Sequence, residues 1–517
     1  MISYIFSENI SILFAALLAI SWYAWLTKKP SKNTPPLPPG PRGLPFVGNL
    51  PFVEPDFHRY LAKLSNIYGP IFKLKLGSKI SIVISSPSLA KQVLKDQDAI
   101  CANRDPPAAG LALTYGGIDI AWRPNGPEWR ELRKVFVREM MRYTRLDASS
   151  ALRGQEVRGM VREVHGKVGT PINIGEHIFL TLRNVVISML WGGTMHGEDS
   201  KSSIVIDQYR QVVDEMVELL GKPNISDVFP VLARFDLQGI ESKMKKLLLW
   251  FDRIFDSEIA QRTKVDQVGE ENEDKSKGSK DFLQFLLELN LQGDEKSSLS
   301  IIQIKALFMD IVIGATDTSS TIIEWAMAEM LQHPETMKKV QEELVEVVGN
   351  DNIVEDFHLS NLHYLDAVVK ETFRLHPPLP LLVPHVPSVS CTLAGYTIPK
   401  GVRIFINAWA IQRHPEAWED PLDFRPERFL LDIGKGDYSG NNFSYLPFGS
   451  GRRICVGVSL AEKLVVFVLA SLLHSFEWKL PEGAKVDFSE KCGLVLKKTK
   501  PLVAIPFAKL TNLKHYN

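Results

Sequence analysis

Cysteine is scarce in this chain, and its spacing excludes two common structural roles. The 517 residues include four widely separated cysteines that form no Cys-x-x-Cys pair: Cys101, Cys391, Cys455 and Cys492. A disulfide scaffold needs a dense cysteine framework and a zinc ribbon needs close pairs, so we expect neither. An excess of charge of one sign is also lacking, because 60 Lys and Arg residues balance 60 Asp and Glu residues. This neutrality gives no overall electrostatic case for a nucleic-acid partner.

The remaining composition is that of a globular enzyme. Hydrophobic residues make up 45% of the chain and charged residues 23%, which is enough to bury a large core. No internal repeat and no long linker appears after the N-terminal region. We therefore predict one large catalytic domain over residues 52–517.

The N-terminal region has the features of a membrane anchor. Residues 10–26 are uncharged and apolar, about the shortest segment that crosses a bilayer as a helix. Glu8 is the only charge before this segment, whereas three lysines follow it directly: Lys28, Lys29 and Lys32. The positive-inside rule then predicts a transmembrane signal anchor at 10–26, a short luminal N-terminus at 1–9 and a cytosolic catalytic domain. A cleaved secretory signal is the alternative, but the basic n-region and the small-residue cleavage pattern of such a signal are missing.

Residues 27–51 form a basic and proline-rich hinge, which we expect to be stiff and extended. The cytosolic placement has a consequence for two glycosylation patterns, at Asn224 and Asn442. Because glycosylation requires the lumen, both are expected to stay unmodified.

Helical spacing of apolar residues dominates the rest of the chain and predicts a mainly α protein with small β-sheets. The longest candidate begins at Ser300, which forms a capping box with Gln303, and it stops at His333 before Pro334. The segments with the clearest helical spacing are 129–141, 204–220, 300–331, 367–375 and 456–474. Short β-branched runs at 80–84 and 403–406 and a turn at 395–401 indicate the sheets.

A glycine-rich loop, Phe-Gly-Ser-Gly-Arg-Arg-Ile-Cys-Val-Gly at 448–457, carries the sharpest chemical signal. Its glycines allow backbone N–H groups to approach Cys455, the following helix directs its positive end at the sulfur, and Arg453 adds a cation. These features favour a thiolate, a soft ligand suited to heme iron. A buried apolar cysteine is the alternative. A dinucleotide fingerprint fails because Ile454 stands where glycine is needed, and a phosphate loop fails because no Gly-Lys-Ser/Thr end follows.

The spacing FxxGxRxCxG resembles that of the cytochrome P-450 superfamily, and Phe448, Gly451, Arg453 and Cys455 fill it. The resemblance implies a fold with heme between a long distal helix and a proximal cysteine loop. It also implies heme b as cofactor, Cys455 as its metal ligand, and Phe448, Gly451 and Arg453 as cofactor-binding residues.

Further motifs agree with the resemblance. Glu371-Thr372-Phe373-Arg374 looks like the family's ExxR pair, and residues 424–429 look like its PERF segment. Glu371 and Arg374 are three residues apart on one helix face and can pair, although an exposed salt bridge would satisfy the same spacing. The resemblance implies a buried structural triad of Glu371, Arg374 and Arg428.

Three more residues resemble cofactor contacts of the family. Trp129 and Arg133 lie four apart, so one helix face presents an indole N–H and a guanidinium suited to a heme propionate. Packing alone would explain the same pair. The resemblance also places His385 near a propionate.

The middle of the long helix combines poor helix formers with an acid from Gly314 to Ser320. The segment 314–318 resembles the family's oxygen-activation motif, with Ala315 where glycine is frequent. The resemblance implies Asp317 and Thr318 as catalytic residues that deliver protons. A helix distortion with Thr318 bonded to a carbonyl is the alternative, and both can hold together. The candidate substrate pocket is apolar: Ala112, Leu113, Gly314, Ala315, Leu381, Leu382 and Val495.

The resemblance implies an NADPH- and O2-dependent monooxygenase that receives electrons from a separate NADPH-cytochrome reductase flavoprotein. Arg130, Lys134 and Arg138 recur every four residues and suit an acidic partner, or simply a solvated helix face. The chain resembles plant microsomal members, which implies single-pass anchoring in the endoplasmic reticulum membrane with the catalytic domain on the cytosolic face.

Within the plant members, residues 221–239 and the C-terminal Thr-Asn-Leu-Lys-His-Tyr-Asn resemble the group that contains a cadinene hydroxylase. The expected reaction is hydroxylation of an apolar specialised metabolite, a sesquiterpene or other terpenoid. A flavonoid or phenylpropanoid hydroxylase is the alternative. A heme-thiolate isomerase or dehydratase and a non-catalytic heme binder are further alternatives of other classes.

Overall fold

The computed structural model describes residues 36–192, 200–268, 281–292, 299–431 and 433–510. The predicted luminal segment 1–9, the predicted membrane span 10–26 and the first part of the hinge lie outside the described residues.

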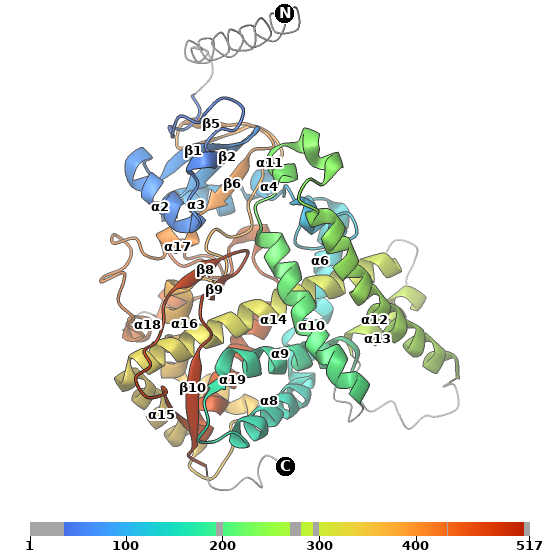
Figure 1. The fold of residues 1–517 in the computed structure, drawn as a ribbon, viewed down its shortest axis with the longest axis vertical. Coiled ribbons are helices and arrows are strands. Elements are labelled where there is room, and N and C mark those ends of the chain that lie inside the picture. Colours follow the sequence, from blue (N-terminus) through green and yellow to red (C-terminus); the bar gives the residue numbers. More distant parts are fainter. Residues whose placement is uncertain (1–35, 193–199, 269–280, 293–298, 432, 511–517) are drawn as a thin grey trace, which may run out of the picture.

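Helices make up most of the described chain, which confirms the mainly α prediction (Figure 1). The longer helices are α2 (Phe57–Tyr68), α6 (Pro127–Glu139), α8 (Ser150–His165), α9 (Ile174–Trp191), α10 (Ser200–Gly221), α12 (Ile240–Val268), α13 (Phe282–Gln292), α14 (Ile301–Gln332), α15 (Pro334–Val348), α16 (His363–Leu375) and α19 (Val458–Ser475). Shorter helices are α3 (Pro87–Lys91), α4 (Asp98–Cys101), α5 (Ala108–Leu113), α7 (Tyr143–Ala148), α11 (Ile225–Val228), α17 (Ala408–Ile411) and α18 (Glu427–Leu431). Single helical turns include η1 (Leu50–Phe52), η2 (Gln92–Asp96), η3 (Pro230–Phe235), η5 (Asp356–Asn361), η6 (Ile433–Gly436) and η7 (Gly451–Arg453).

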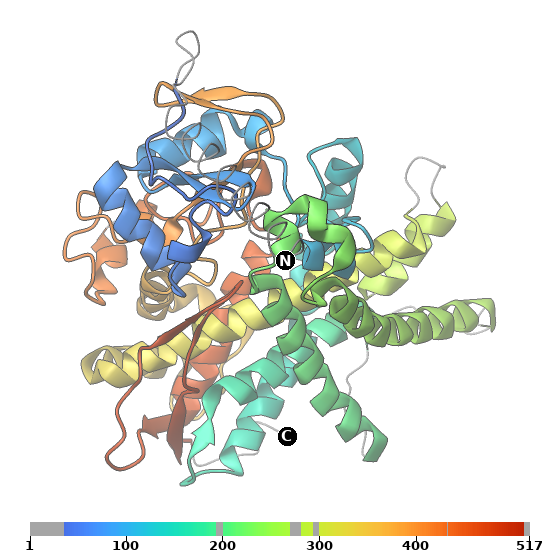
Figure 2. The same ribbon diagram turned by 45° about the horizontal axis from the view of Figure 1, so that its top comes forward.

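Helix α14 crosses the whole molecule and is the element around which the others pack (Figures 1 and 2). It contacts α9, α16 and α19, and most of its residues are buried. The capping box of Ser300 and Gln303 is present, with the Ser300 side chain accepting from the Gln303 N–H at 3.3 Å. The helix ends at Gln332, with His333 as its C-cap, so both predicted ends are confirmed within one residue.

The strands form small sheets, of which β1–β2–β6 and β4–β5 lie in the part of the molecule built from the N-terminal residues and residues 391–406 (Figure 1). β1 pairs antiparallel with β2, with Ile71 opposite Ile84, and β2 pairs parallel with β6, with Ser81 opposite Arg403. β10 joins β3 and β7, while β4–β5 and β8–β9 are two-stranded. The strands are β1 (Ile71–Leu76), β2 (Lys79–Ile84), β3 (Ile172–Asn173), β4 (Cys391–Leu393), β5 (Tyr396–Ile398), β6 (Arg403–Ile406), β7 (Phe476–Lys479), β8 (Glu490–Cys492), β9 (Leu496–Lys498) and β10 (Val503–Ala508).

Two described helices, α14 and α19, are long and apolar enough to cross a membrane, and 72% of the most apolar window of each is buried inside the protein. They are core helices by this burial, since a lipid-facing helix would present its apolar side chains outward.

Candidate functional site

The cysteine loop is shaped by glycines and leads directly into α19. Gly449 and Gly451 have φ of 72° and 65°, a backbone region that favours glycine. A Cβ on Gly451 would collide with the Leu94 carbonyl oxygen and lie 2.9 Å from Asp98 Oδ1. The Cys455 N–H donates to the Phe448 carbonyl at 2.9 Å, and the Gly457 N–H donates to Cys455 Sγ at 3.3 Å. The loop thus holds the sulfur in a fixed place at the N-terminus of α19.

The cation that lowers the pKa of the Cys455 thiol is not the one expected from the sequence. Desolvation by the surrounding protein raises the pKa of the Cys455 thiol although the residue is exposed, while the Gly457 N–H and the Arg133 guanidinium lower it by less. Two of the predicted contributions to a thiolate, a loop N–H group and a cation, are present. The cation that acts on the sulfur is Arg133, whereas Arg453 donates away from it to the carbonyls of Ala102 and Ile120 at 2.7 and 3.0 Å.

The Glu371–Arg374 pair is buried, and Arg428 also contacts Glu371. Glu371 accepts from Arg374 Nε and Nη2 at 2.7 and 2.8 Å and from Arg428 Nε at 3.0 Å. The side chains of Glu371 and Arg374 are fully buried. The exposed-salt-bridge alternative thus fails for this pair.

The triad is also tied to the cysteine loop. Arg374 Nη1 donates to the Gln412 carbonyl at 3.0 Å, and Gln412 Oε1 accepts from the Leu446 N–H at 2.8 Å. Leu446 lies two residues before Phe448, whose ring packs against Phe373 at 5.1 Å between centroids. An ion pair on α16 therefore restrains the segment that enters the loop.

Basic side chains also gather beside the cysteine loop. The guanidinium of Arg453 lies over the Trp129 ring, 3.9 Å from its centroid, and Arg133 Nη2 donates to the Ile454 carbonyl at 2.5 Å. Burial, followed by the charges of Arg453 and Arg133, lowers the pKa of Arg104 well below its ordinary value. Burial and then the charge of Arg104 also lower the pKa of His385. Arg104 was missed by sequence reasoning because no local motif marks it.

Two of the predicted cofactor contacts have protein partners in this structure. The Trp129 indole N–H donates to the Ile120 carbonyl at 2.9 Å, and His385 Nδ1 donates to the Cys101 carbonyl at 3.1 Å. Trp129 thus positions the two arginines and the 119–123 segment, while its N–H is directed at a backbone oxygen.

The loop before α6 links this basic cluster to the distal helix. Asp310, one turn before Gly314, accepts from the Ile120 N–H at 2.7 Å. Burial raises the pKa of Asp119 to about 6, and burial together with Asp119 raises that of Asp310 well above its ordinary value. Asp310 is therefore the more readily protonated of the two carboxyl groups.

Asp317 is buried on α14 and paired with a residue that sequence reasoning did not find. Lys497 Nζ on β9 lies 2.5 Å from Asp317 Oδ1 and 3.3 Å from Asp214 Oδ1, while Asp317 Oδ2 has no hydrogen-bond partner among the described residues. Burial raises the pKa of Asp317, and Lys497 lowers it by a smaller amount. Thr318 Oγ1 donates to the Gly314 carbonyl at 2.6 Å, as the helix-distortion alternative anticipated.

The predicted pocket residues are divided between regions. Ala112, Leu113, Ala315 and Val495 belong to the same large apolar core, and a Cβ on Gly314 would meet nothing within 4 Å. Leu382 and Leu381 pack in two other clusters, around β6 and around α2 and β1, respectively. Leu382 nevertheless lies close to the cysteine loop, because a Cβ on Gly449 would be 3.9 Å from its Cδ1.

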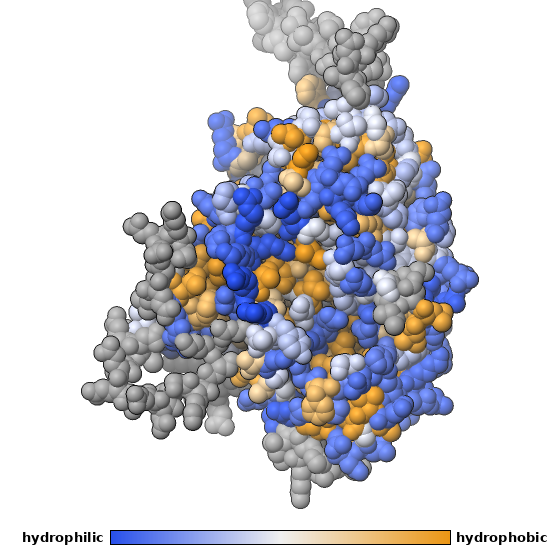
Figure 3. All heavy atoms as spheres, turned by 180° about the vertical axis from the view of Figure 1, so that it is seen from behind, coloured by the Kyte–Doolittle hydropathy of each residue, from blue (hydrophilic) through white to orange (hydrophobic). Residues whose placement is uncertain are grey.

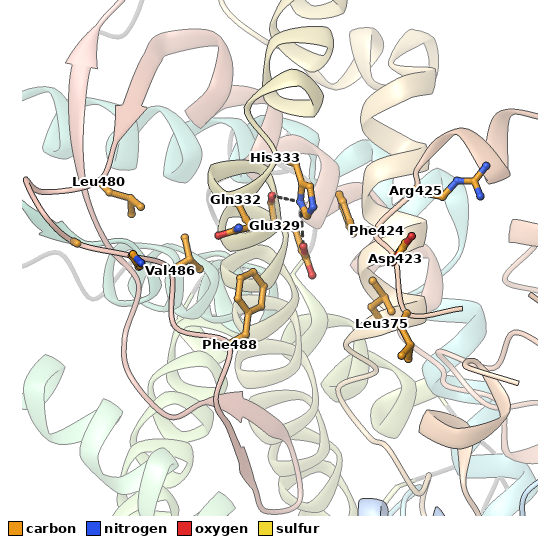
Figure 4. Close-up of a pocket in the computed structure, with 13 residues that line it drawn as sticks. Glu329, Gln332, His333, Leu375, Asp423, Phe424, Arg425, Leu480, Val486 and Phe488 are labelled. Carbon is orange, nitrogen blue, oxygen red and sulfur yellow. Dashed lines mark hydrogen bonds and ion pairs between the residues drawn. The ribbon is translucent and has the colours of Figure 1, made fainter. Parts of the chain in front are cut away.

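A separate cavity of about 920 Å³ opens near the C-terminal end of α14 (Figure 4). Glu329, His333, Phe424, Arg425 and Phe488 are among its lining residues. None of the predicted catalytic, cofactor-binding or pocket residues lines it, so it is distinct from the candidate site.

The family model for cytochrome P450 matches residues 38–505. The chain belongs to the cytochrome P450 family. This cytochrome P450 is 37% identical over 507 residues to a flavonoid 3'-monooxygenase of Crocosmia x crocosmiiflora, covering 96% of this chain and 98% of that protein. It is 36% identical over 509 residues to geraniol 8-hydroxylase of Catharanthus roseus, covering 96% and 99%. A zebra fish cytochrome P450 solved with progesterone has the same fold, with a TM-score of 0.72, 25% identity, and coverage of 87% of this chain and 99% of that chain.

The chain is thus a plant cytochrome P450 and a heme-thiolate monooxygenase, which uses heme b with a cysteine thiolate and electrons from a reductase. The residues present fit this cofactor. Cys455 is exposed on its loop, and Gly314 is exposed in the middle of a helix that is otherwise mostly buried. Arg104, Arg133 and Arg453 lie beside the loop, and each has a lowered pKa. A sulfur ligand, a small distal residue and a cationic edge match the iron, the ring face and the two carboxylates of heme.

Proposed function

We propose that this cytochrome P450 hydroxylates an apolar plant specialised metabolite, a sesquiterpene or other terpenoid. The supporting observation is that Ala112, Leu113, Ala315 and Val495 are apolar and belong to the large core that also contains most of the buried apolar residues of α14. Such side chains select a substrate by shape and offer it few directed hydrogen bonds.

Each candidate site residue has a proposed role. Cys455 ligates the iron, with Phe448 and Gly451 shaping its loop. Arg133, Arg453 and His385 hold the propionates, with Arg104 added to this set, and Trp129 supports the arginines from the ring side. Glu371, Arg374 and Arg428 lock the proximal segment. Bound heme supplies the activation of O2.

Asp317 and Thr318 are proposed to control protons on the distal side. Because Thr318 donates its hydrogen to Gly314, its oxygen can only accept, which orients a water hydrogen toward it. The Oδ2 atom of Asp317 has no partner in the described part of the chain and can take a proton and pass it on. Lys497 holds the other carboxylate oxygen and connects it through Asp214 to the half-exposed Arg210.

A flavonoid hydroxylase is the second candidate, and the relatives favour it. Flavonoid 3'-monooxygenases and a flavonoid 3',5'-hydroxylase of Solanum melongena match this chain at 37–38% identity, slightly above geraniol 8-hydroxylase at 36%. A polyphenol would need polar partners in the pocket to satisfy its hydroxyl groups.

Microsomes that contain the full chain and a plant reductase separate these candidates. They are supplied with NADPH and, in parallel, with monoterpene alcohols, sesquiterpene hydrocarbons and flavonoids. We expect hydroxylated terpenoids and no flavonoid product. A flavonoid-only profile would overturn the substrate proposal, turnover without NADPH would indicate an isomerase or dehydratase, and no turnover would indicate a heme binder.

We also propose that the reductase docks on α6 and that the chain is anchored in the endoplasmic reticulum membrane. Arg130, Lys134 and Arg138 are exposed on α6, and the back face of the molecule carries strongly hydrophilic side chains beside an apolar area (Figure 3). Three exposed cations that recur every four residues along α6 suit an acidic partner.

Exposed apolar side chains support the membrane attachment. Ser78 Oγ donates to the Val228 carbonyl at 2.8 Å, so the end of α11, two residues before η3, lies against the β1–β2 turn. Phe46, Val231 and Phe235 of this region are 71%, 81% and 54% exposed. Large apolar side chains gathered on one surface suit contact with lipid.

A further inference from the structure

Cys101 and Cys391 are far apart in sequence but adjacent in the fold. Cys101 ends α4 and is fully buried, while Cys391 begins β4 and is half-buried. Both pack in the same apolar cluster, and each thiol shifts the pKa of the other. Two free thiols in contact are a potential disulfide if the backbone keeps them there.

The backbone does keep them there, because hydrogen bonds join the two segments on either side of the pair. The Ser388 N–H donates to the Ile100 carbonyl at 2.9 Å, and Gln97 Nε2 donates to the Thr392 carbonyl at 2.8 Å. The Val386 N–H donates to the Asn103 carbonyl at 3.0 Å. These contacts do not involve the sulfurs, so the alignment does not depend on the thiol pair.

We propose that Cys101 and Cys391 form a reversible disulfide in response to hydrogen peroxide and thereby fasten the α4 segment to β4. The segment matters because its carbonyls hold residues of the candidate cofactor site. The Cys101 carbonyl accepts from His385 Nδ1 at 3.1 Å and the Ala102 carbonyl accepts from Arg453 Nε at 2.7 Å. The disulfide restrains these carbonyls.

The two thiols have different roles in the oxidation by hydrogen peroxide. Cys391 is the more accessible, and the neighbouring Cys101 thiol lowers its pKa, so it supplies the thiolate. Its sulfur attacks one oxygen of hydrogen peroxide, the O–O bond breaks, and a sulfenic acid and water result. The Cys101 sulfur then attacks the sulfenic sulfur, an S–S bond replaces the S–O bond, and a second water leaves. The two thiols lose two electrons in total and the peroxide gains them.

The chain offers a matched control. Cys492 on β8 is also half-buried, but burial raises the pKa of its thiol, so it should oxidise more slowly. Trypsin separates all the cysteines, because Cys101, Cys391 and Cys492 fall on the peptides 96–104, 375–400 and 492–497.

The test uses the full-length holoprotein treated with hydrogen peroxide, alkylated and digested without reduction. We expect a linked peptide of 96–104 and 375–400 that is two hydrogens lighter than the sum of its parts and disappears with dithiothreitol. It should form at least tenfold faster than oxidation of Cys492, and the midpoint of thermal unfolding should rise. Cys101→Ser should leave Cys391 as a sulfenic or sulfinic acid, and Cys391→Ser should leave Cys101 reduced, both with the unfolding midpoint unchanged by peroxide.

Parallel oxidation of Cys391 and Cys492 without a linked peptide would overturn the proposal. So would a linked peptide that joins Cys391 to any cysteine other than Cys101.

Discussion

At the scale of single residues, the buried carboxylate of Glu371 accepts hydrogen bonds from two guanidiniums and from the Arg425 N–H. Replacing it with alanine leaves Arg374 buried without its partner, which costs about 3–5 kcal/mol. We expect Glu371→Ala to yield protein without heme, measured as the heme-to-protein ratio of purified material.

The control for this prediction is Glu342→Ala on α15. Glu342 pairs with Lys338 at 3.7 Å, but both side chains are more than 60% exposed, so its loss should change stability by less than about 1 kcal/mol. A normal heme content in Glu371→Ala would refute the locking role.

Lys497 provides a second prediction at this scale, because it lowers the pKa of Asp317. Lys497→Gln should raise that pKa further, so the limb of the pH profile that reports Asp317 should move to higher pH. Product formed per NADPH, measured across pH, follows this limb. The free energy of unfolding should also depend on pH. Because the pKa of Asp317 is higher in the folded protein than in the unfolded chain, the free energy of unfolding falls as pH rises through the folded-state pKa. In Lys497→Gln this fall should extend to higher pH.

Lys500→Gln is the matched control, since Lys500 is exposed and pairs with Asp487 at 2.9 Å. If Lys497→Gln left the limb in place, or moved it to lower pH, Asp317 would not depend on this ion pair.

At the scale of elements, two glycines in the site should respond oppositely to a methyl group. Gly451 has φ of 65° and would press a Cβ against the Leu94 carbonyl oxygen, so Gly451→Ala should deform the loop and abolish heme binding. Gly314 is helical with open space at its Cβ, so Gly314→Ala should keep heme and stabilise the protein by about 0.5–1 kcal/mol. Heme content and denaturant unfolding of both variants measure this. Equal heme retention would show that the loop backbone is not constrained.

Local signals explain which elements could be predicted. The capping box at Ser300 and the stop before Pro334 act within a few residues, so the ends of α14 were found from the sequence. The helix α9 was missed because it is buried on nearly all sides and its apolar residues show little period. The segment 395–401 was interpreted as a turn, yet β5 occupies Tyr396–Ile398 because it pairs with β4, a partner that local sequence does not reveal.

The same reasoning applies to the candidate site. The glutamate, the arginine and the cysteine of the motifs were found because each motif is short and chemically distinctive. Arg104, Asp310 and Lys497 were missed because their importance comes from partners in other elements, Arg453, Ile120 and Asp317. Pairing across such distances depends on the fold and leaves no local pattern.

At the scale of the whole molecule, the anchor and the cytosolic orientation form one prediction. The chain should remain in the membrane after alkaline carbonate extraction of microsomes, and added protease should digest the catalytic domain without detergent. Deglycosylation should leave its mobility unchanged, in agreement with the buried side chain of Asn224. Release by carbonate would contradict the anchor, and protection from protease or a mobility shift would contradict the orientation.

The central claim is that Cys455 supplies the thiolate to the heme iron. The most direct measurement is the absorption spectrum of the reduced carbon monoxide complex of the native chain, Cys455→His and Cys492→Ser. The account predicts the long-wavelength thiolate-type Soret band for the native chain and Cys492→Ser, and a band at shorter wavelength for Cys455→His. A thiolate-type band that persisted in Cys455→His would contradict it.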